Sequence, residues 1–145
     1  MRALLQRTSE AKVVVDGKTV GQIGPGLVVF LGITHEDGEK DIDALVNKIV
    51  NLRVFPSDKG YFDKSLLEEK KDVLIVSQFT LYGSCNKGRR PDFMAAAKPE
   101  VAEPLYDKFV NKMKETGINV ATGEFQAMMD VHLVNNGPVT FMLET

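Results

Sequence analysis

Two short segments, far apart in the chain, contain the residue types best suited to chemistry. The first, Ser77-Gln78-Phe79-Thr80, follows an apolar run that predicts a buried strand over residues 72–76. The second, Asn135 to Thr140, contains the Gly137-Pro138 pair, and Gly and Pro are the residues that fix unusual backbone conformations. Each feature is common by itself, so a specific assignment depends on both occurring together in this order.

The hydroxyl groups of Ser77 and Thr80 are candidate nucleophiles. An activated Ser or Thr needs a nearby base, and the chain has only two histidines, His35 and His132, neither of them close in sequence. A structural role, in which both hydroxyls satisfy backbone groups at a strand end, is the simpler interpretation from the residues alone. A second functional interpretation needs no side chain, because N–H groups of Phe79 and Thr80, freed where the strand ends, would donate to a developing oxyanion.

Other reactive side chains give little support for a nucleophile or a metal centre. Cys85 lies in a predicted exposed loop with no activating His or carboxylate near it, so an incidental thiol is the preferred interpretation over a cysteine nucleophile. As the single cysteine it excludes an internal disulfide. His35, Glu36 and Asp37 are too clustered for a zinc site, which uses three or four separated ligands. We therefore expect no metal and no cofactor.

Length and composition predict one domain over residues 1–145. The chain has 145 residues and is 43% hydrophobic, enough for one proper core. Its net charge of −2 argues against a protein that coats nucleic acid, although a local basic patch is allowed, and we expect no DNA partner. No apolar run approaches the roughly 20 residues that span a bilayer, and Met1 leads into an alternating segment instead of a signal peptide. We expect a cytoplasmic protein without a membrane partner.

Hydrophobic periodicity predicts an α+β fold with its helices on one side of the sheets. The first three strands are expected to form a meander. A first helix is predicted from Glu39 to Ile49 and a second from Ala102 to Met113, with Gly117 as its C-terminal cap. The predicted strands cover residues 3–15, 19–23, 27–33, 54–56, 73–78, 118–122, 128–134 and 139–143.

Together, the segments from Ser77 to Leu81 and from Asn135 to Thr140 resemble the paired signature of D-aminoacyl-tRNA deacylases, which remove wrongly attached D-amino acids from tRNA. The resemblance extends from Arg2 to the C-terminus. It implies a single domain of antiparallel-rich sheets packed in β/β/α layers, with two main helices on one side. Tyr82 is a departure, since many relatives have a small or hydroxyl residue there.

The resemblance also implies roles for the first segment. Residues 77–80 would form the catalytic wall, with Gln78 and Thr80 lining it and Phe79 stacking near the terminal adenosine of the tRNA. The resemblance further implies that the ribose 2′-hydroxyl of the tRNA takes the place of a protein base, and this group can position or activate the attacking water. The ester bond is expected to be hydrolysed to a free D-amino acid and tRNA.

For the second segment, the resemblance implies a Gly137-Pro138 bond in the cis form. This pair would enter the active site of the partner subunit in a homodimer, where its carbonyl oxygens face the substrate. L-amino acids would be rejected by steric clash, whereas glycine, which has no side chain, would escape rejection. Arg7 is expected to brace the Gly-Pro carbonyls, and Asn136 is a further supporting residue.

Three cations between Tyr82 and Pro91 are candidate tRNA contacts. Lys87, Arg89 and Arg90 would reach phosphates of the acceptor end, although solvated loop charge explains them equally well. The segment from Gly123 to Ala127 resembles another family segment beside the pocket, and a strand-linking turn is the alternative.

Two other functions fit parts of the pattern. One is a tRNA-binding or nucleotide-binding module without catalysis, which would show no ester turnover. The other is a small serine or cysteine esterase, which would lose its activity when Ser77 or Cys85 is replaced.

Overall fold

The first strand is the centre of the sheet. In the computed structural model, which describes residues 1–145, the first half of β1 (Arg2–Val15) pairs with β3 (Gly26–Gly32) and its second half with β2 (Lys18–Ile23), both antiparallel. The predicted meander order is therefore wrong, because β1 lies between β2 and β3. Alternation along a segment predicts that it is a strand but does not determine its neighbours.

Two further strands extend the sheet in parallel. β6 (Asp72–Ser77) pairs with β3, and β7 (Val120–Thr122) pairs with β6. β8 (Asp130–Glu144) runs antiparallel along β1, so the two strands predicted at the end of the chain are one strand with register shifts. The order is β2-β1-β3-β6-β7, with β8 on β1.

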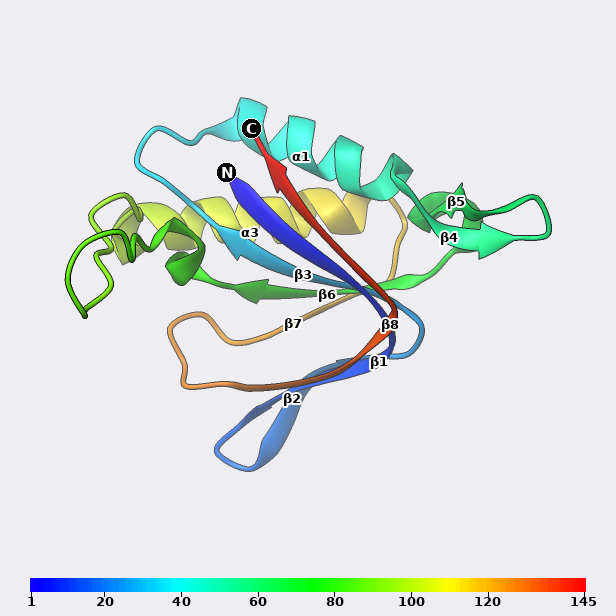
Figure 1. Cartoon of the computed structure of the whole chain (residues 1–145), viewed down its shortest axis with the longest axis horizontal. Helices are drawn as coiled ribbons and strands as arrows, with labels where there is room; N and C mark the ends of the chain where they lie inside the picture. Colours follow the sequence, from blue (N-terminus) through cyan, green and yellow to red (C-terminus); the bar gives the residue numbers. More distant parts are fainter.

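The layers follow from strands that are buried on both faces. Helices α1 (Glu39–Asn51) and α3 (Pro99–Glu115) cover one face of β3 and β6, while β2 lies on the other side (Figure 1). Val29 and Ile75 belong to the larger core with the helices, whereas their neighbours Val28 and Leu74 belong to a smaller core with Val13. Adjacent residues of a strand point to opposite faces. The predicted α+β fold with β/β/α layers is confirmed.

Both predicted helices are present. α1 buries the apolar stripe that predicted it, and the Asp41 carboxylate accepts a hydrogen bond of 2.9 Å from the Gly38 N–H at its start. α3 begins with Pro99, where a missing N–H costs nothing, and buries Phe109 and Met113. Gly117 follows α3 with a φ of +83°, the left-handed conformation expected of a C-terminal cap.

A hairpin and a short helix project from one end of the domain. β4 (Arg53–Ser57) was predicted, but β5 (Gly60–Ser65) and α2 (Leu66–Glu69) were not. In α2, Ser65 and Glu68 cap each other through reciprocal side-chain to backbone hydrogen bonds, and Leu66 is buried. β5 was missed because its residues are mostly exposed and do not alternate, and α2, with four residues, is too short for a helical period.

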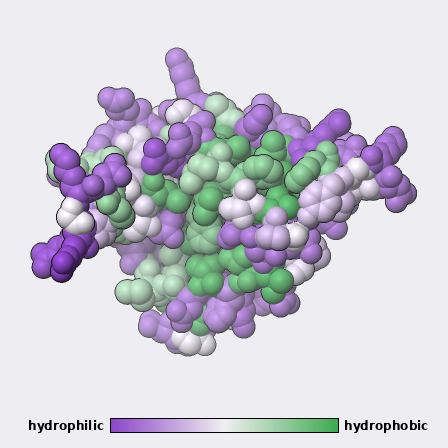
Figure 2. Space-filling view, in the orientation of Figure 1, coloured by the Kyte–Doolittle hydropathy of each residue, from purple (hydrophilic) through white to green (hydrophobic).

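The exposed surface of β8 carries apolar side chains. Val134, Phe141 and Met142 are each at least 40% exposed, and Figure 2 shows a hydrophobic band across the face on which β8 lies. β8 pairs only with β1, so its other edge is free. No helix has the length and apolar content needed to cross a membrane.

Candidate active site

The predicted catalytic segment lies at the carboxyl end of a central parallel strand. β6 ends at Ser77 and is followed by the short 3₁₀ helix η1 (Phe79–Tyr82). The N–H of Gln78 donates to the carbonyl of Leu31 at 2.8 Å, which keeps the segment attached to β3. Ligands in α/β sheets often bind in the crevice beyond the carboxyl ends of parallel strands, so this segment lies where a ligand-binding site is expected.

The N–H groups of Phe79 and Thr80 make no hydrogen bond within the chain. These are the first residues of η1, where no preceding helical turn supplies an acceptor. The far end of η1 is fixed by Arg2, whose Nη1 donates to the Leu81 carbonyl at 2.8 Å and whose guanidinium lies 4.6 Å from the centre of the Tyr82 ring. Two unpaired donors are therefore held beside the strand end.

No base lies beside the hydroxyl groups of this segment. The Gln78 side-chain amide donates to the Thr80 hydroxyl, and Ser77 has no side-chain hydrogen bond. His35 instead contacts the Met94 carbonyl at 2.7 Å. Burial raises the pKa of Tyr82 to about 12, so its phenol stays protonated at neutral pH. A Ser or Thr nucleophile lacks the partner that would activate it.

A pocket of about 670 Å³ opens beside this segment. It includes Phe125, Gln126 and Ala127, so the segment expected beside the pocket is there. None of its lining side chains is ionisable at neutral pH, and Cys85, exposed in its loop, does not line it. The lining residues are Leu31, Ile33, Val76, Ser77, Gln78, Phe79, Ala97, Pro99, Ala102, Phe125, Gln126, Ala127, Met128, Met129 and Val131.

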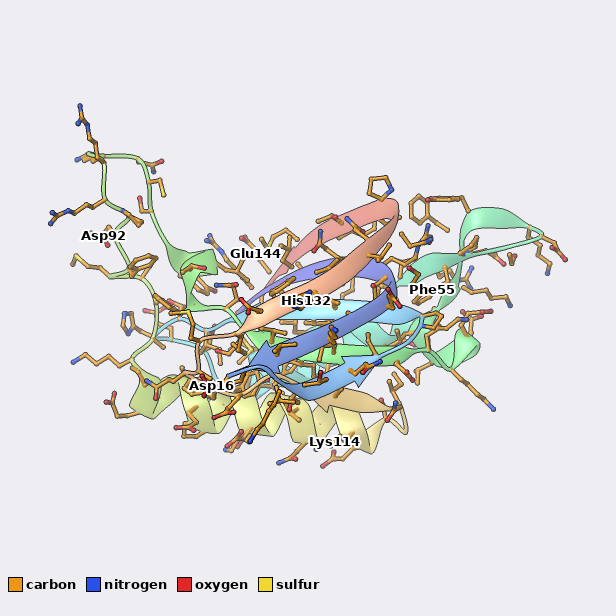
Figure 3. The ribbon with its side chains drawn as sticks, turned by 90° about the horizontal axis from the view of Figure 1, so that it is seen from below. Asp16, Phe55, Asp92, Lys114, His132 and Glu144 are labelled. Carbon is orange, nitrogen blue, oxygen red and sulfur yellow. The ribbon has the colours of Figure 1, made fainter.

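The predicted cationic loop lies next to η1. Ser84 and Asp92 close its base through two backbone hydrogen bonds of 2.7 and 2.8 Å, and the Phe93 ring lies 5.0 Å from that of Phe79. The loop around Asp92 stands away from the body of the domain (Figure 3), and Figure 2 shows a strongly hydrophilic projection at this end. Three cations at its tip are exposed and form no ion pair: Lys87, Arg89 and Arg90.

The Gly137-Pro138 bond is cis, as the resemblance implied. Gly137 has a φ of +122°, which favours glycine. The pairing of β8 with β1 passes from Thr140 to Asn135, so the residues between them, 136–139, have no partner on β1. We call residues 136–139 the Gly-Pro segment.

Arg7 supports the Gly-Pro segment, but at a different carbonyl from the one expected. Its Nε donates to the carbonyl of Asn136 at 3.2 Å, one residue before the Gly-Pro pair. Asn135 adds a second support, because its Oδ1 accepts from the Val139 N–H at 3.3 Å and its Nδ2 donates to the Thr140 hydroxyl at 3.0 Å. The predicted support by Arg7 is present, and the prediction of its acceptor was wrong by one residue.

Within one chain the two signature segments are far apart. η1 follows β6 at one end of the domain, whereas β8 bends at the other end, beside β4 and β5 (Figures 1 and 3). Neither Gly137 nor Pro138 lines the pocket. A single chain therefore does not bring the two segments into one site.

The comparisons with known proteins agree over the whole length. The sequence model of the family described as D-Tyr-tRNA(Tyr) deacylase matches residues 4–144. The chain belongs to this deacylase family. It is 55% identical over 145 residues to the D-aminoacyl-tRNA deacylase of Brevibacillus brevis, covering 100% of both chains, and 55% identical to that of Bacillus mycoides, covering 99% of the relative.

Solved structures give the same fold. A structure titled c-Myc DNA Unwinding Element Binding Protein matches with a TM-score of 0.94 and 41% identity, over 100% of this chain and 99% of the other. A structure titled as a probable eukaryotic D-amino acid tRNA deacylase matches with a TM-score of 0.84 and 22% identity, over 98% and 97%. The predicted resemblance and the assignment to a family of hydrolases are confirmed.

Tyr61 contacts Arg7 beside the Gly-Pro segment, and the sequence alone did not point to it. It lies on β5, an unpredicted strand, and its hydroxyl accepts a hydrogen bond of 2.7 Å from Nη2 of Arg7. Met128 and Met129 of the pocket were missed as well, because they belonged to a predicted strand that begins only at Asp130. An aromatic residue after a turn glycine is too common a pattern to mark Tyr61 as functional.

Proposed function

We propose that the protein hydrolyses the ester bond of D-aminoacyl-tRNA and releases the free D-amino acid and tRNA. The observation that carries this proposal is a pocket without ionisable side chains beside two unpaired backbone N–H groups, those of Phe79 and Thr80. Such a site can stabilise an oxyanion but supplies no base, so it fits a substrate that brings its own polar group.

The tRNA substrate has such a group. Water attacks the ester carbonyl carbon, positioned or activated by the vicinal 2′-hydroxyl, and the developing oxyanion accepts hydrogen bonds from the Phe79 and Thr80 N–H groups. The carbonyl then re-forms as the 3′-oxygen leaves and takes up a proton. Gln78 and Phe79 line the pocket, and Phe79, 54% exposed, is available to stack on the terminal adenosine.

Selection against L-amino acids is assigned to the Gly-Pro segment of a partner subunit. The separation of Gly137 and Pro138 from their own pocket supports action across a homodimer, as do the free edge and exposed apolar side chains of β8. The rigid backbone of this segment would leave no room for the side chain of an L-amino acid, which is then rejected by steric clash. Glycyl-tRNA, which has no side chain to reject, is a further proposed substrate. Because the proposed substrate is an aminoacylated tRNA, the cytoplasm is the proposed location.

The direct test measures hydrolysis of matched D- and L-aminoacyl-tRNAs that share one tRNA and one amino acid, with glycyl-tRNA as a third substrate. Turnover of the D-substrate and of glycyl-tRNA, with little of the L-substrate, is expected. A protein that binds these tRNAs without turnover would be a binding module instead. Loss of turnover on Ser77→Ala or Cys85→Ala, in a folded protein, would indicate the esterase alternative.

A further inference from the structure

The Gly-Pro segment rests on a buried cation that has no acidic partner. Arg7 is 4% exposed and forms no ion pair. Its three nitrogen atoms donate in three directions: Nε to the Asn136 carbonyl, Nη1 to the Val54 carbonyl at 2.7 Å, and Nη2 to the Tyr61 hydroxyl. A buried guanidinium is stable only if its donors are satisfied, so the position of Arg7 depends on these three acceptors.

Tyr61 contributes to this arrangement in two ways. Its hydroxyl accepts from Arg7, and the centre of its ring lies 4.8 Å from the guanidinium carbon, within reach of a cation–π interaction. Tyr61 also packs edge-on against Phe62, whose ring lies 6.1 Å from that of Phe141 on β8. The β4–β5 hairpin therefore contacts β8 after the Gly-Pro pair through Phe62, and it is linked to the carbonyl before the pair through Arg7.

Gly137 lies directly against the two side chains. A Cβ atom at position 137 would be 2.7 Å from the Tyr61 hydroxyl and 2.9 Å from Nη2 of Arg7. Because the Gly-Pro segment has no partner on β1, its side-chain restraints are few: Asn135 holds the amide of Val139, and Arg7 holds the carbonyl of Asn136. Arg7 is the restraint that links the segment to β4 and β5.

We propose that Tyr61 is a positioning residue for substrate selection. By fixing the guanidinium of Arg7, it fixes the peptide plane between Asn136 and Gly137, and with it the backbone that precedes Pro138. This inference rests on the proposed function, in which the Gly-Pro segment selects D-amino acids. Tyr61 acts through Arg7 and touches neither the pocket nor the 77–80 segment, so its effect is on discrimination and not on the chemical step.

The test is Tyr61→Phe, which removes the hydroxyl and keeps the ring over Arg7. Loss of one hydrogen bond to a charged group should lower the ratio of D- to L-aminoacyl-tRNA hydrolysis about fivefold, while kcat on the D-substrate stays within about twofold. Hydrogen–deuterium exchange of peptides covering residues 134–140 should become faster by a similar factor of about five. The exchange measurement detects the positioning without any substrate.

Tyr106→Phe is the matched control. It also removes one tyrosine hydroxyl, which donates to the Ile75 carbonyl at 2.9 Å on the helix side of the sheet. It should lower the melting temperature without changing the exchange of residues 134–140 or the D/L ratio. Unchanged exchange or an unchanged ratio in Tyr61→Phe would overturn the proposal, and so would the same changes in Tyr106→Phe. A wild-type protein without D-specific turnover would refute the proposed function, while the exchange result would still decide whether Tyr61 positions the segment.

Discussion

The structure leaves no room for a side chain at Gly137. Besides its contacts with Tyr61 and Arg7, an added Cβ would lie 2.8 Å from Cγ2 of Val139, and its φ of +122° is unfavourable for any L-residue. We predict that Gly137→Ala destabilises the protein by about 1–3 kcal/mol, the range for strained backbone, and displaces the segment enough to impair D-aminoacyl-tRNA hydrolysis. Thermal melting and steady-state kinetics measure the two effects.

Gly117→Ala separates strain from displacement. Gly117 also has a positive φ, +83°, but no atom lies within 4 Å of the added Cβ. It should lower stability by a comparable backbone term of about 1 kcal/mol and leave hydrolysis unchanged. If Gly137→Ala were as active as Gly117→Ala, the Gly-Pro segment would have no part in the site.

Thr80 separates backbone catalysis from side-chain catalysis. If its N–H is the functional group, Thr80→Ala should keep D-aminoacyl-tRNA hydrolysis within about tenfold of the wild type, because removing a true oxyanion donor costs about a hundredfold to a thousandfold. Single-turnover rates on folded variants measure this. Abolished turnover in Thr80→Ala, together with an acyl-enzyme trapped on the wild type, would contradict the backbone mechanism.

A tRNA ending in 2′-deoxyadenosine should be hydrolysed far more slowly, because it lacks the 2′-hydroxyl that positions or activates the attacking water.

At the scale of elements, periodicity predicted the helices and the long strands but not their arrangement. The stripe of Ile42, Leu45 and Ile49 is a local property of one helix, so α1 was predictable. The position of β1 between β2 and β3 depends on pairing between residues distant in sequence, which a local pattern does not contain. β8 was predicted as two strands because Gly137 and Pro138 look like a turn, whereas the strand continues past them.

The candidate site was predictable to the same extent. The 77–80 and 135–140 segments were found because their residues form a recognisable pair of motifs. Tyr61 was not found, because its role depends on the hydroxyl reaching Arg7, 54 residues away in the sequence. The error in the acceptor of Arg7 has the same origin, since which carbonyl a guanidinium reaches depends on the shape of the folded segment.

The loop between Ser84 and Asp92 has a prediction of its own. If Lys87, Arg89 and Arg90 contact tRNA phosphates, replacing each with Gln should raise KM for aminoacyl-tRNA with little change in kcat. Each replacement should also reduce the slope of log affinity against log salt by about one. Titrations of tRNA binding measure the slope, at salt concentrations between roughly 50 and 200 mM, because affinity that depends on phosphate contacts falls steeply over this range.

Lys114→Gln is the control for this loop. Lys114 is an exposed cation on α3, away from the loop around Asp92 (Figure 3). The Lys114→Gln variant loses one positive charge, as each loop variant does, but leaves the proposed tRNA contacts unchanged. Equal salt slopes for the Arg89→Gln and Lys114→Gln variants would show that the loop cations are only solvated surface charge.

At the scale of the whole molecule, the two halves of the proposed site lie at opposite ends of the folded domain. The proposed two-fold dimer would join them, because an isologous contact that brings one Gly-Pro segment to the partner's pocket also does the reverse. β8 offers a free edge and exposed apolar residues for such a contact. Sedimentation at micromolar concentration should therefore give a dimer, and a monomer with full activity would exclude action across subunits.

Mixed dimers decide which chain supplies each half. Ala127→Trp should fill the pocket and leave the Gly-Pro segment intact, whereas Gly137→Val should displace that segment and leave the pocket intact. Each variant alone should be nearly inactive. If the halves come from different chains, a heterodimer has one site with both defects and one with none. Equal mixing and subunit exchange give about half heterodimers, so activity should recover to about a quarter of the wild type. If each chain used its own Gly-Pro segment, both sites of the heterodimer would be defective and mixing would restore nothing.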